Sequence, residues 1–167
     1  MELMEKFDNK RRPLNKLGER YHDVKDEYVQ GVHVWIMNGK KELLIQRRNP
    51  NKRVHPNVWS TAGGGVDAGE TTLSTAIREC QEELGIDLKV DELELLMSYR
   101  RSYDFVDIYL AKKDVDIKDV VIQEEEVSEV KWASFEELEE LIKTKKTSEN
   151  VELYFSFFKE LVKKLEK

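Results

Sequence analysis

The sequence predicts one α/β domain, covering residues 1–167, built on a mixed and largely antiparallel β-sheet. Three observations predict this class. A strand pair joined by a tight turn is expected over 28–46, and an amphipathic helix over 71–84. Three further strands follow between 93 and 132 with no second crossover helix among them, so most sheet neighbours should run antiparallel.

The predicted strands are runs of apolar and β-branched residues bounded by turn signals. They cover residues 28–37, 42–46, 58–62, 93–99, 105–111 and 127–132. Asn38 and Gly39 supply a tight turn between the first two, which predicts a β-hairpin. Asn and Pro residues between 49 and 57 mark a loop. The three glycines at 63–65 are expected to end regular structure.

The predicted helices are recognised by apolar residues at helical spacing. In the first helix these residues are Leu73, Ala76, Ile77, Cys80 and Leu84, and Gly85 follows as a natural stop. Ser134 and Glu137 form a capping box that opens a second helix. A terminal helix carries a stripe that we assign to core packing, formed by Tyr154, Phe157, Phe158, Leu161 and Leu165.

Composition narrows the classes of function. Hydrophobic residues make up 40% and charged residues 37%, which suits a packed core with a heavily solvated surface. The formal net charge of -6 disfavours nucleic acid as a partner, whereas divalent cations could bridge a small anionic substrate to protein carboxylates. With one cysteine, no membrane-length apolar stretch and no signal-peptide pattern, we expect a soluble cytoplasmic protein, with homodimerisation left open.

Three glutamates of the first helix predict a metal site. Glu79, Glu82 and Glu83 are spaced i, i+3 and i+4, so their carboxylates lie on one face. Like-charge neighbours at this spacing each cost about 0.2–0.5 kcal/mol, which calls for a compensating cation. Hard oxygen ligands on one face suit Mg²⁺ or Mn²⁺, which complete their coordination with waters and substrate phosphates.

The segment 64–86 resembles the Nudix box, G-x5-E-x7-R-E-U-x-E-E-x-G-U. Its fixed positions are filled by Gly64, Glu70, Arg78, Glu79, Glu82, Glu83 and Gly85, with Cys80 and Ile86 at the apolar positions. The resemblance implies a Nudix hydrolase with a three-layer α/β/α sandwich, in which the box forms loop, helix and loop. Its glutamates would bind divalent metal, and Gly64 and Gly85 would have structural roles.

The resemblance also implies a role for each charged residue of the box. Glu79 and Glu83 are the expected metal ligands, and Glu82 is a further ligand, either direct or through water. Glu70 would orient Arg78 or reach a metal-bound water. From their positions alone we expect Arg78 and Glu70 to form an ion pair that ties the loop to the helix.

Residues outside the box resemble a second branch, the isopentenyl diphosphate isomerases. The similar positions are 27–28, 32–36, 43–48, Lys52, Pro56 and Trp59. Those isomerases carry a catalytic cysteine and a histidine ligand where this chain has Gly63 and Gly65. Cys80 belongs to the apolar face of the helix, so isomerisation lacks its acid and hydrolysis is the better interpretation. The alternatives are an isomerase-like enzyme and a non-catalytic nucleotide- or metabolite-binding Nudix domain.

The three histidines are interpreted as structural or surface residues. His22 corresponds to an isomerase metal ligand, but the matching second histidine is replaced by Val29. His33 alternates with apolar residues in a predicted strand, and His55 lies in a polar loop. None of the three therefore predicts a metal site.

Charged residues outside the box supply candidate substrate binders and a candidate base. Arg47 and Arg48 lead a basic cluster at 47–53, which either clamps substrate phosphates or is a solvated strand end. Glu126 closes the acidic run 124–126 just before a strand and is the best candidate for a general base, the alternative being a solvated acidic loop.

The predicted reaction is hydrolysis of a diphosphate linkage, with water attacking phosphorus. Two or three Mg²⁺ ions held by Glu79, Glu83 and, as a further ligand, Glu82 would act as Lewis acid and template, so no covalent intermediate is needed. The group attached to the diphosphate stays open, since a nucleoside, sugar, isoprenoid or cofactor would all fit.

Overall fold

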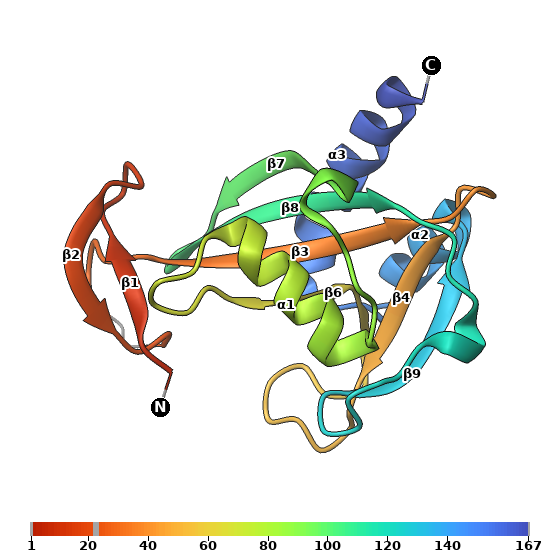
Figure 1. The fold of residues 1–167 in the computed structure, drawn as a ribbon, viewed down its shortest axis with the longest axis horizontal. Coiled ribbons are helices and arrows are strands. Elements are labelled where there is room, and N and C mark those ends of the chain that lie inside the picture. Colours follow the sequence, from red (N-terminus) through yellow and green to blue (C-terminus); the bar gives the residue numbers. More distant parts are fainter. Residues whose placement is uncertain (1, 22–23, 167) are drawn as a thin grey trace.

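The computed structural model describes residues 2–21 and 24–166 and centres on a seven-stranded sheet (Figure 1). The sheet strands are β3 Val29–Met37, β4 Leu43–Arg48, β5 Trp59–Ser60, β6 Ala62–Gly65, β7 Leu93–Arg100, β8 Asp104–Lys112 and β9 Val127–Ala133. A separate hairpin consists of β1 Met4–Phe7 and β2 Pro13–Gly18. The helices are α1 Thr72–Leu84, α2 Phe135–Lys143 and α3 Glu149–Leu165, with short 3₁₀ turns at Val90–Glu92 and Ile117–Asp119.

The topology confirms the predicted mixed, largely antiparallel sheet. The strand order is β5-β4-β3-β8-β7, with β6 beside β3 and β9 beside β4. β3 and β8 run parallel, and every other pair in the described sheet is antiparallel. Because β3 and β8 are parallel, the first residues of both strands lie at the same end of the sheet.

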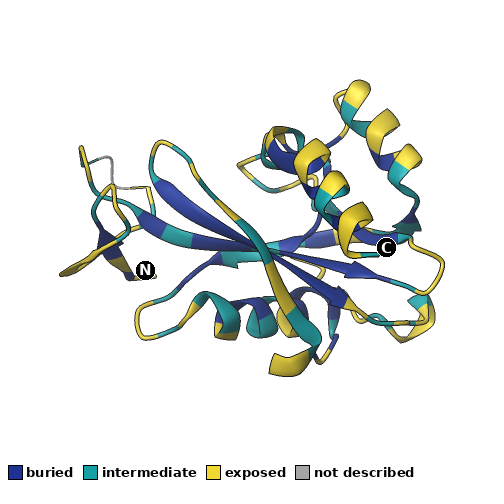
Figure 2. Cartoon of the chain, turned by 90° about the horizontal axis from the view of Figure 1, so that it is seen from above, coloured by how far each residue is buried: buried dark blue, intermediate teal, exposed yellow. Residues whose placement is uncertain are grey.

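Helices cover both faces of the sheet, which gives three layers (Figure 2). Side chains alternate along β3, so Trp35 and Met37 pack with α2 and α3 while Val34 and Ile36 pack with α1. Cys80 is fully buried in the α1 layer, as its place on the apolar face of the helix predicted.

Two sequence predictions about strands are corrected. β3 and β4 do form a hairpin, but their described register has one pair, Met37 with Leu43, because β6 takes the rest of that edge of β3. The glycines at 63–65 do not end regular structure, since they lie within β6. A Cβ on Gly63 would lie 2.2 Å from the carbonyl oxygen of Val32, so glycine is what lets the two backbones approach this closely.

The stripe predicted for the terminal helix was wrong in phase. Tyr154 and Phe158 are buried, but Phe157 is 66% exposed and Leu165 is 48% exposed. The buried face of α3 consists of Val151, Tyr154, Phe155, Phe158 and Val162. Aromatic residues occupy both sides of this helix, so helical spacing alone selects two faces equally well.

The N-terminal hairpin of β1 and β2 was not predicted from the sequence. It lies at one end of the sheet (Figure 1) and is joined to it by a β-bridge between Phe7 and Tyr28. The Arg11 guanidinium, in the turn of the hairpin, forms two 2.8 Å hydrogen bonds with the buried Asp107 carboxylate of β8. The hairpin thereby shields the beginnings of β3 and β8.

None of the helices in the described part of the chain combines the length and the hydropathy that a bilayer span requires.

Candidate functional site

The box helix is held at both ends by local interactions. Thr71 caps the N-terminus of α1, accepting a hydrogen bond from Ser74 N, and the Ser74 hydroxyl accepts one from Thr71 N in return. Gly85 ends the helix in the left-handed conformation with φ of 65°. The predicted helix and its glycine stop are confirmed, and they fix the direction of the carboxylates that α1 carries.

Two of the box carboxylates are buried side by side. Glu83 is 6% exposed and accepts hydrogen bonds from Gln46 Nε2 at 2.9 Å and from Gly63 N at 3.2 Å. The side chain of Glu79 is 13% exposed and lies against Gly64. A Cβ on Gly64 would lie 2.2 Å from Glu79 Oε1, so the first glycine of the box makes room for this carboxylate.

Burial disfavours the charged forms of these two carboxyl groups. It raises the pKa of Glu79 to about 7, although the neighbouring Arg78 acts in the opposite direction. It raises the pKa of Glu83 to about 8, and the nearby Glu79 adds to that rise. Arg78 forms an ion pair with Glu79 at 3.1 Å, whereas no cation among the described residues forms one with Glu83.

The predicted ion pair between Arg78 and Glu70 is confirmed. Arg78 Nε donates to Glu70 Oε1 at 2.8 Å, and Thr75 Oγ1 holds the other oxygen of Glu70 at 2.7 Å. Arg78 NH1 reaches both Glu79 and Glu82 at 3.1 Å. The guanidinium therefore ties the box loop to the helix and fixes the carboxylate face from one side.

Glu79, Glu82, Glu83 and Glu126 line one cavity of about 470 Å³, which we call the carboxylate cavity. Glu82 is half exposed at its rim. Glu126 stands across from the helix, with Lys52 Nζ 2.6 Å from its Oε1. The segment before Glu126 is fixed to the end of α1, because Gln123 N donates to the carbonyl oxygen of Glu83 at 3.0 Å.

The structure separates the two arginines predicted to bind substrate. Arg48 lines the carboxylate cavity, together with Lys52 and Arg53 of the predicted basic cluster. Arg47 does not line that cavity or the smaller one described below. Its NH1 instead lies 3.6 Å from Glu129 Oε2 of β9. Adjacent residues of a strand point to opposite faces, so the two could not both reach one site.

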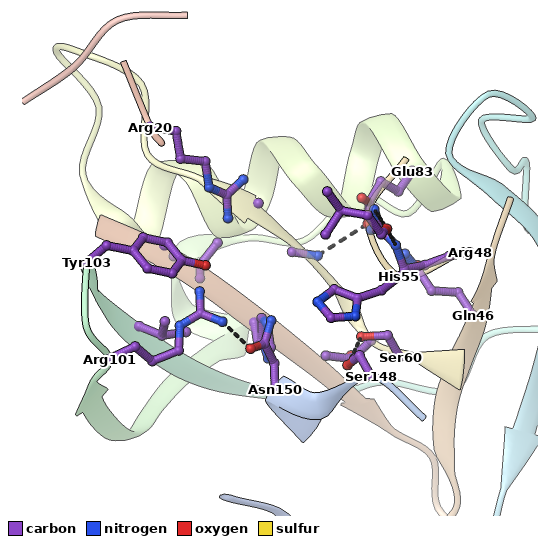
Figure 3. A pocket seen from close by; sticks show the side chains of 18 of the residues that line it. Arg20, Gln46, Arg48, His55, Ser60, Glu83, Arg101, Tyr103, Ser148 and Asn150 are labelled. Carbon is purple, nitrogen blue, oxygen red and sulfur yellow. Dashed lines mark hydrogen bonds between the residues drawn. The ribbon is translucent and has the colours of Figure 1, made fainter. Parts of the chain in front are cut away.

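A second cavity of about 150 Å³ adjoins the first, and we call it the inner cavity. Figure 3 shows Glu83, Gln46, Arg48 and His55 on one side of it, and Arg20, Arg101 and Tyr103 on the other. Its walls also include His33, Ser60, Ser148 and Asn150. Sequence analysis missed Arg20, Arg101 and Tyr103, since none of them belongs to a motif. The position of His22 lies outside the described residues.

The donor atoms of the carboxylate cavity fit a divalent cation. No cluster of three or more His, Cys, Asp or Glu side chains in residues 2–21 and 24–166 is arranged to hold one ion. Mg²⁺ commonly uses one or two carboxylates and completes its coordination with waters and phosphates. Glu79 and Glu83, buried together and opening into a roomy polar cavity, meet that requirement.

Of the two positions compared above with the isomerase cysteine and histidine, position 63 has no room for a side chain, because a Cβ on Gly63 would meet the backbone carbonyl oxygen of Val32 at 2.2 Å. A Cβ on Gly65 would require only that the end of the Met4 side chain move. Cys80 cannot substitute, because it is fully buried and burial raises the pKa of its thiol.

Comparison with known proteins agrees with the box. The family model of the NUDIX domain matches residues 27–155. An uncharacterised Nudix hydrolase of Listeria monocytogenes is 40% identical over 111 residues, a match that covers 66% of this chain and 66% of that protein. Nudix hydrolase 3 of Arabidopsis thaliana is 33% identical over 134 residues, which cover 72% of this chain and 17% of the plant protein.

Solved structures share the fold. The crystal structure of DR0079 from Deinococcus radiodurans has a TM-score of 0.74 at 23% identity, covering 88% of this chain and 92% of the other. A C. elegans Ap4A hydrolase has a TM-score of 0.56 at 27% identity, covering 80% of this chain and 98% of the other. The domain match across 27–155, the relative at 40% identity and the filled box together show that this chain belongs to the Nudix hydrolase family.

Proposed function

We propose that this Nudix hydrolase is a divalent-metal-dependent enzyme that cleaves the diphosphate linkage of a small phosphorylated metabolite. The observation that carries the proposal is the buried pair Glu79 and Glu83, which lines a cavity together with Arg48 and Lys52. Carboxylates for a cation and basic groups for phosphate thus share one space.

Glu79 and Glu83 would hold the metal, with Glu82 as a further ligand, direct or through water. Mg²⁺, or Mn²⁺ in its place, when bound neutralises charge on phosphate oxygens and lowers the pKa of a bound water. Arg78 keeps Glu79 and Glu82 in place through its 3.1 Å hydrogen bonds, and Glu70 in turn holds Arg78. This second set of contacts fixes the orientation of the carboxylates before any ligand arrives.

Other side chains that line the carboxylate cavity would carry out the remaining steps. Arg48, Lys52 and Arg53 bind the phosphate oxygens. Glu126 accepts a proton from the attacking water, whose oxygen bonds to one phosphorus while the bridging P–O bond breaks and its electron pair leaves with the other phosphate. Two phosphate-bearing products result, and the reaction needs no covalent enzyme intermediate.

The inner cavity would receive the group attached to the diphosphate. Its walls carry arginine, histidine, serine and amide side chains, which suit a polar group rather than a hydrocarbon chain. The name of the similar C. elegans protein, an Ap4A hydrolase, supports a nucleotide. Of the candidate classes, a nucleoside diphosphate derivative therefore fits better than an isoprenoid diphosphate.

The test is a panel of diphosphate compounds assayed with Mg²⁺ or with chelator, measuring released phosphate and nucleotide. We expect hydrolysis only with divalent metal, and a fall in turnover of about 10²-fold or more in Glu83→Gln. Glu125→Gln, on an exposed side chain outside both cavities, is the matched control and should keep full turnover. Undiminished hydrolysis with chelator present would refute the proposal.

A further inference from the structure

A buried chain of hydrogen bonds runs behind the inner cavity, outside the residues assigned to hydrolysis. Trp35 Nε1 donates to the hydroxyl of Tyr154 at 2.9 Å. The same hydroxyl lies 2.7 Å from Nδ1 of His33, whose ring forms part of the cavity wall. Trp35 is fully buried and Tyr154 is 2% exposed, so water does not compete for these groups.

The direction of this chain follows from what each group can do. An indole N–H only donates, so the Tyr154 oxygen must accept from Trp35. The single hydroxyl proton of Tyr154 then needs an acceptor, and His33 Nδ1 is the other partner within hydrogen-bonding distance among the described residues. Nδ1 is therefore unprotonated, and the network assigns the ring proton to Nε2.

The surroundings keep the imidazole neutral. Burial lowers the pKa of His33 to about 3, and the positive charge of Arg101 acts in the same direction. One neutral tautomer thus persists at the pH of the cell. Nε2 has no hydrogen-bond partner among the described residues, and it is not closed off from solvent. Its N–H is open to the cavity.

Two other polar side chains of the inner cavity are not free to bind a ligand. Gln46 is 4% exposed; its Nε2 donates to Glu83, and its Oε1 is closed off from the cavity although it has no donor in the described part of the chain. Arg101 already pairs with Asp104 and Asn150. The N–H of His33 Nε2 is therefore a fixed donor that the protein itself does not use.

We infer that His33 is a specificity-determining residue whose Nε2–H donates to a carbonyl oxygen or ring nitrogen of a nucleobase on the substrate. This inference rests on the proposed function, because it concerns the group attached to the diphosphate. A nucleobase edge offers acceptors of this kind. A hydrocarbon group has none and would leave the His33 N–H unpaired, so the cavity selects against it.

The tautomer is tested first, without any turnover. Protein with ¹⁵N-labelled histidine should show His33 as one species, with Nδ1 unprotonated and Nε2 protonated. Tyr154→Phe keeps the ring and removes both hydrogen bonds, so a mixture of tautomers is expected in that variant. A proton on Nδ1 in the wild-type protein would overturn the inference.

Specificity is tested with substitutions at position 33. His33→Phe should raise KM about tenfold for the best nucleotide substrate while kcat stays unchanged, because the lost hydrogen bond forms in ground and transition states alike. His33→Gln carries an amide N–H close to the position of Nε2 and should restore the wild-type KM. Glu124→Gln, on an exposed side chain outside both cavities, is the control and should keep the wild-type KM. Equal KM values for wild type and His33→Phe would overturn the inference.

The two levels of proposal can fail separately. If no compound is hydrolysed, the proposed function is refuted, and the inference is then decided by titrating AMP and UMP into the labelled protein with chelator present. A shift of the His33 Nε2 resonance that disappears in Tyr154→Phe supports nucleobase recognition. An unshifted resonance at saturating nucleotide would contradict it.

Discussion

At the scale of single residues, Gly64 shows why a fixed glycine opens the box. Its missing side chain is the space in which Glu79 lies, since a Cβ at this position would be 2.2 Å from Glu79 Oε1. The motif alone predicts that a glycine stands here. Only the three-dimensional structure shows that the requirement is steric, because Gly64 is not one of the described glycines with positive φ.

Gly64→Ala should therefore displace Glu79 rather than unfold the protein. We expect weaker Mg²⁺ binding and a loss of turnover of about 10- to 100-fold, the range for residues that orient a metal ligand. Activity titrated against Mg²⁺ measures both quantities. Gly39→Ala is the control, since its Cβ would meet its nearest neighbour, Asp114, at an ordinary 3.5 Å far from the cavity. Unchanged magnesium dependence in Gly64→Ala would contradict the steric explanation.

Glu126 is the residue for which sequence left two interpretations. The acidic run 124–126 was expected to be either a solvated loop or the source of the base. Glu124 and Glu125 are exposed and line neither cavity, whereas Glu126 lines the carboxylate cavity and pairs with Lys52. Glu124 and Glu125 therefore fit the solvated loop, and Glu126 stays our candidate for the base.

Glu126→Gln should lower turnover by about 10²- to 10⁴-fold if Glu126 takes the proton of the attacking water. Magnesium affinity should change little, because the carboxylates of α1 are untouched. Recovery of activity at high Mg²⁺ would instead identify Glu126 as a metal ligand. Glu124→Gln serves as the control, and wild-type turnover in Glu126→Gln across the pH range would exclude both roles.

At the scale of elements, sequence predicted those whose signals are local. The capping box at Ser134, the left-handed Gly85 and the alternation along β3 each involve neighbouring residues, and the structure confirms them. The phase of α3 was wrong because its buried side is decided by the sheet it packs on. The hairpin of β1 and β2 was missed because most of its side chains are exposed in β2 and leave no alternation.

The missed site residues lie in elements whose position depends on pairing far along the chain. Arg101 and Tyr103 precede β8, and the parallel pairing of β8 with β3 brings them to the edge where β6 ends at Gly65. A turn of arginine and tyrosine before a strand carries no motif of its own. Sequence could reveal it only after the strand order was known.

The N-terminal hairpin should contribute to stability through Arg11. Burial raises the pKa of Asp107, but hydrogen bonds from Arg11 and Ser98 outweigh it, so the pKa is lowered overall. A carboxyl group with a lowered folded-state pKa stabilises the fold above its unfolded-state pKa, and that stabilisation is lost as the pH falls through the folded-state pKa. Acidification should therefore weaken the attachment of the hairpin.

Arg11→Met should lower the free energy of unfolding by about 3 kcal/mol at neutral pH, because it leaves a buried carboxylate without its partner. The difference from wild type should shrink as Asp107 becomes protonated in acid. Denaturant unfolding between pH 2 and pH 7 measures both effects. Arg12→Met is the matched control in the same turn, since Arg12 is 69% exposed and its surface pair with Asp8 should change stability little. Equal losses in the two variants would exclude a special role for Arg11.

At the scale of the whole molecule, two separate cores hold the sheet between α1 and the C-terminal helices. The two cavities lie where this sandwich is open, with the carboxylates supplied by α1 and the walls of the inner cavity supplied by strand ends and the start of α3. Gly64 and Glu83 line both cavities, so the proposed metal site and the proposed site of the substrate group share one wall. A substitution at Gln46, which donates to Glu83, would therefore affect both.

The buried carboxylates make the stability of the whole fold depend on pH and metal together. Burial raises the pKa of Glu79 to about 7 and that of Glu83 to about 8, above the value of 4.5 for an ordinary glutamate. Between pH 4.5 and about 8 the folded protein binds more protons than the unfolded chain, so the free energy of unfolding falls as the pH rises. Mg²⁺ bound at the proposed site would compete with those protons and would stabilise the native state more strongly at higher pH.

Thermal unfolding at pH 5 to 8, with chelator or with Mg²⁺, tests this linkage. With chelator we expect Tm to fall across this range, and with Mg²⁺ we expect a smaller fall, so that the gap between the two curves widens as the pH rises. Glu79→Gln combined with Glu83→Gln should flatten the chelator curve and close the gap, because amides neither titrate nor bind the cation well. Glu124→Gln combined with Glu125→Gln removes the same number of charges from exposed positions and should leave both curves unchanged in shape. A Tm that rises with pH in chelator, or a gap that stays constant, would show that the two carboxyl groups are not the linked site.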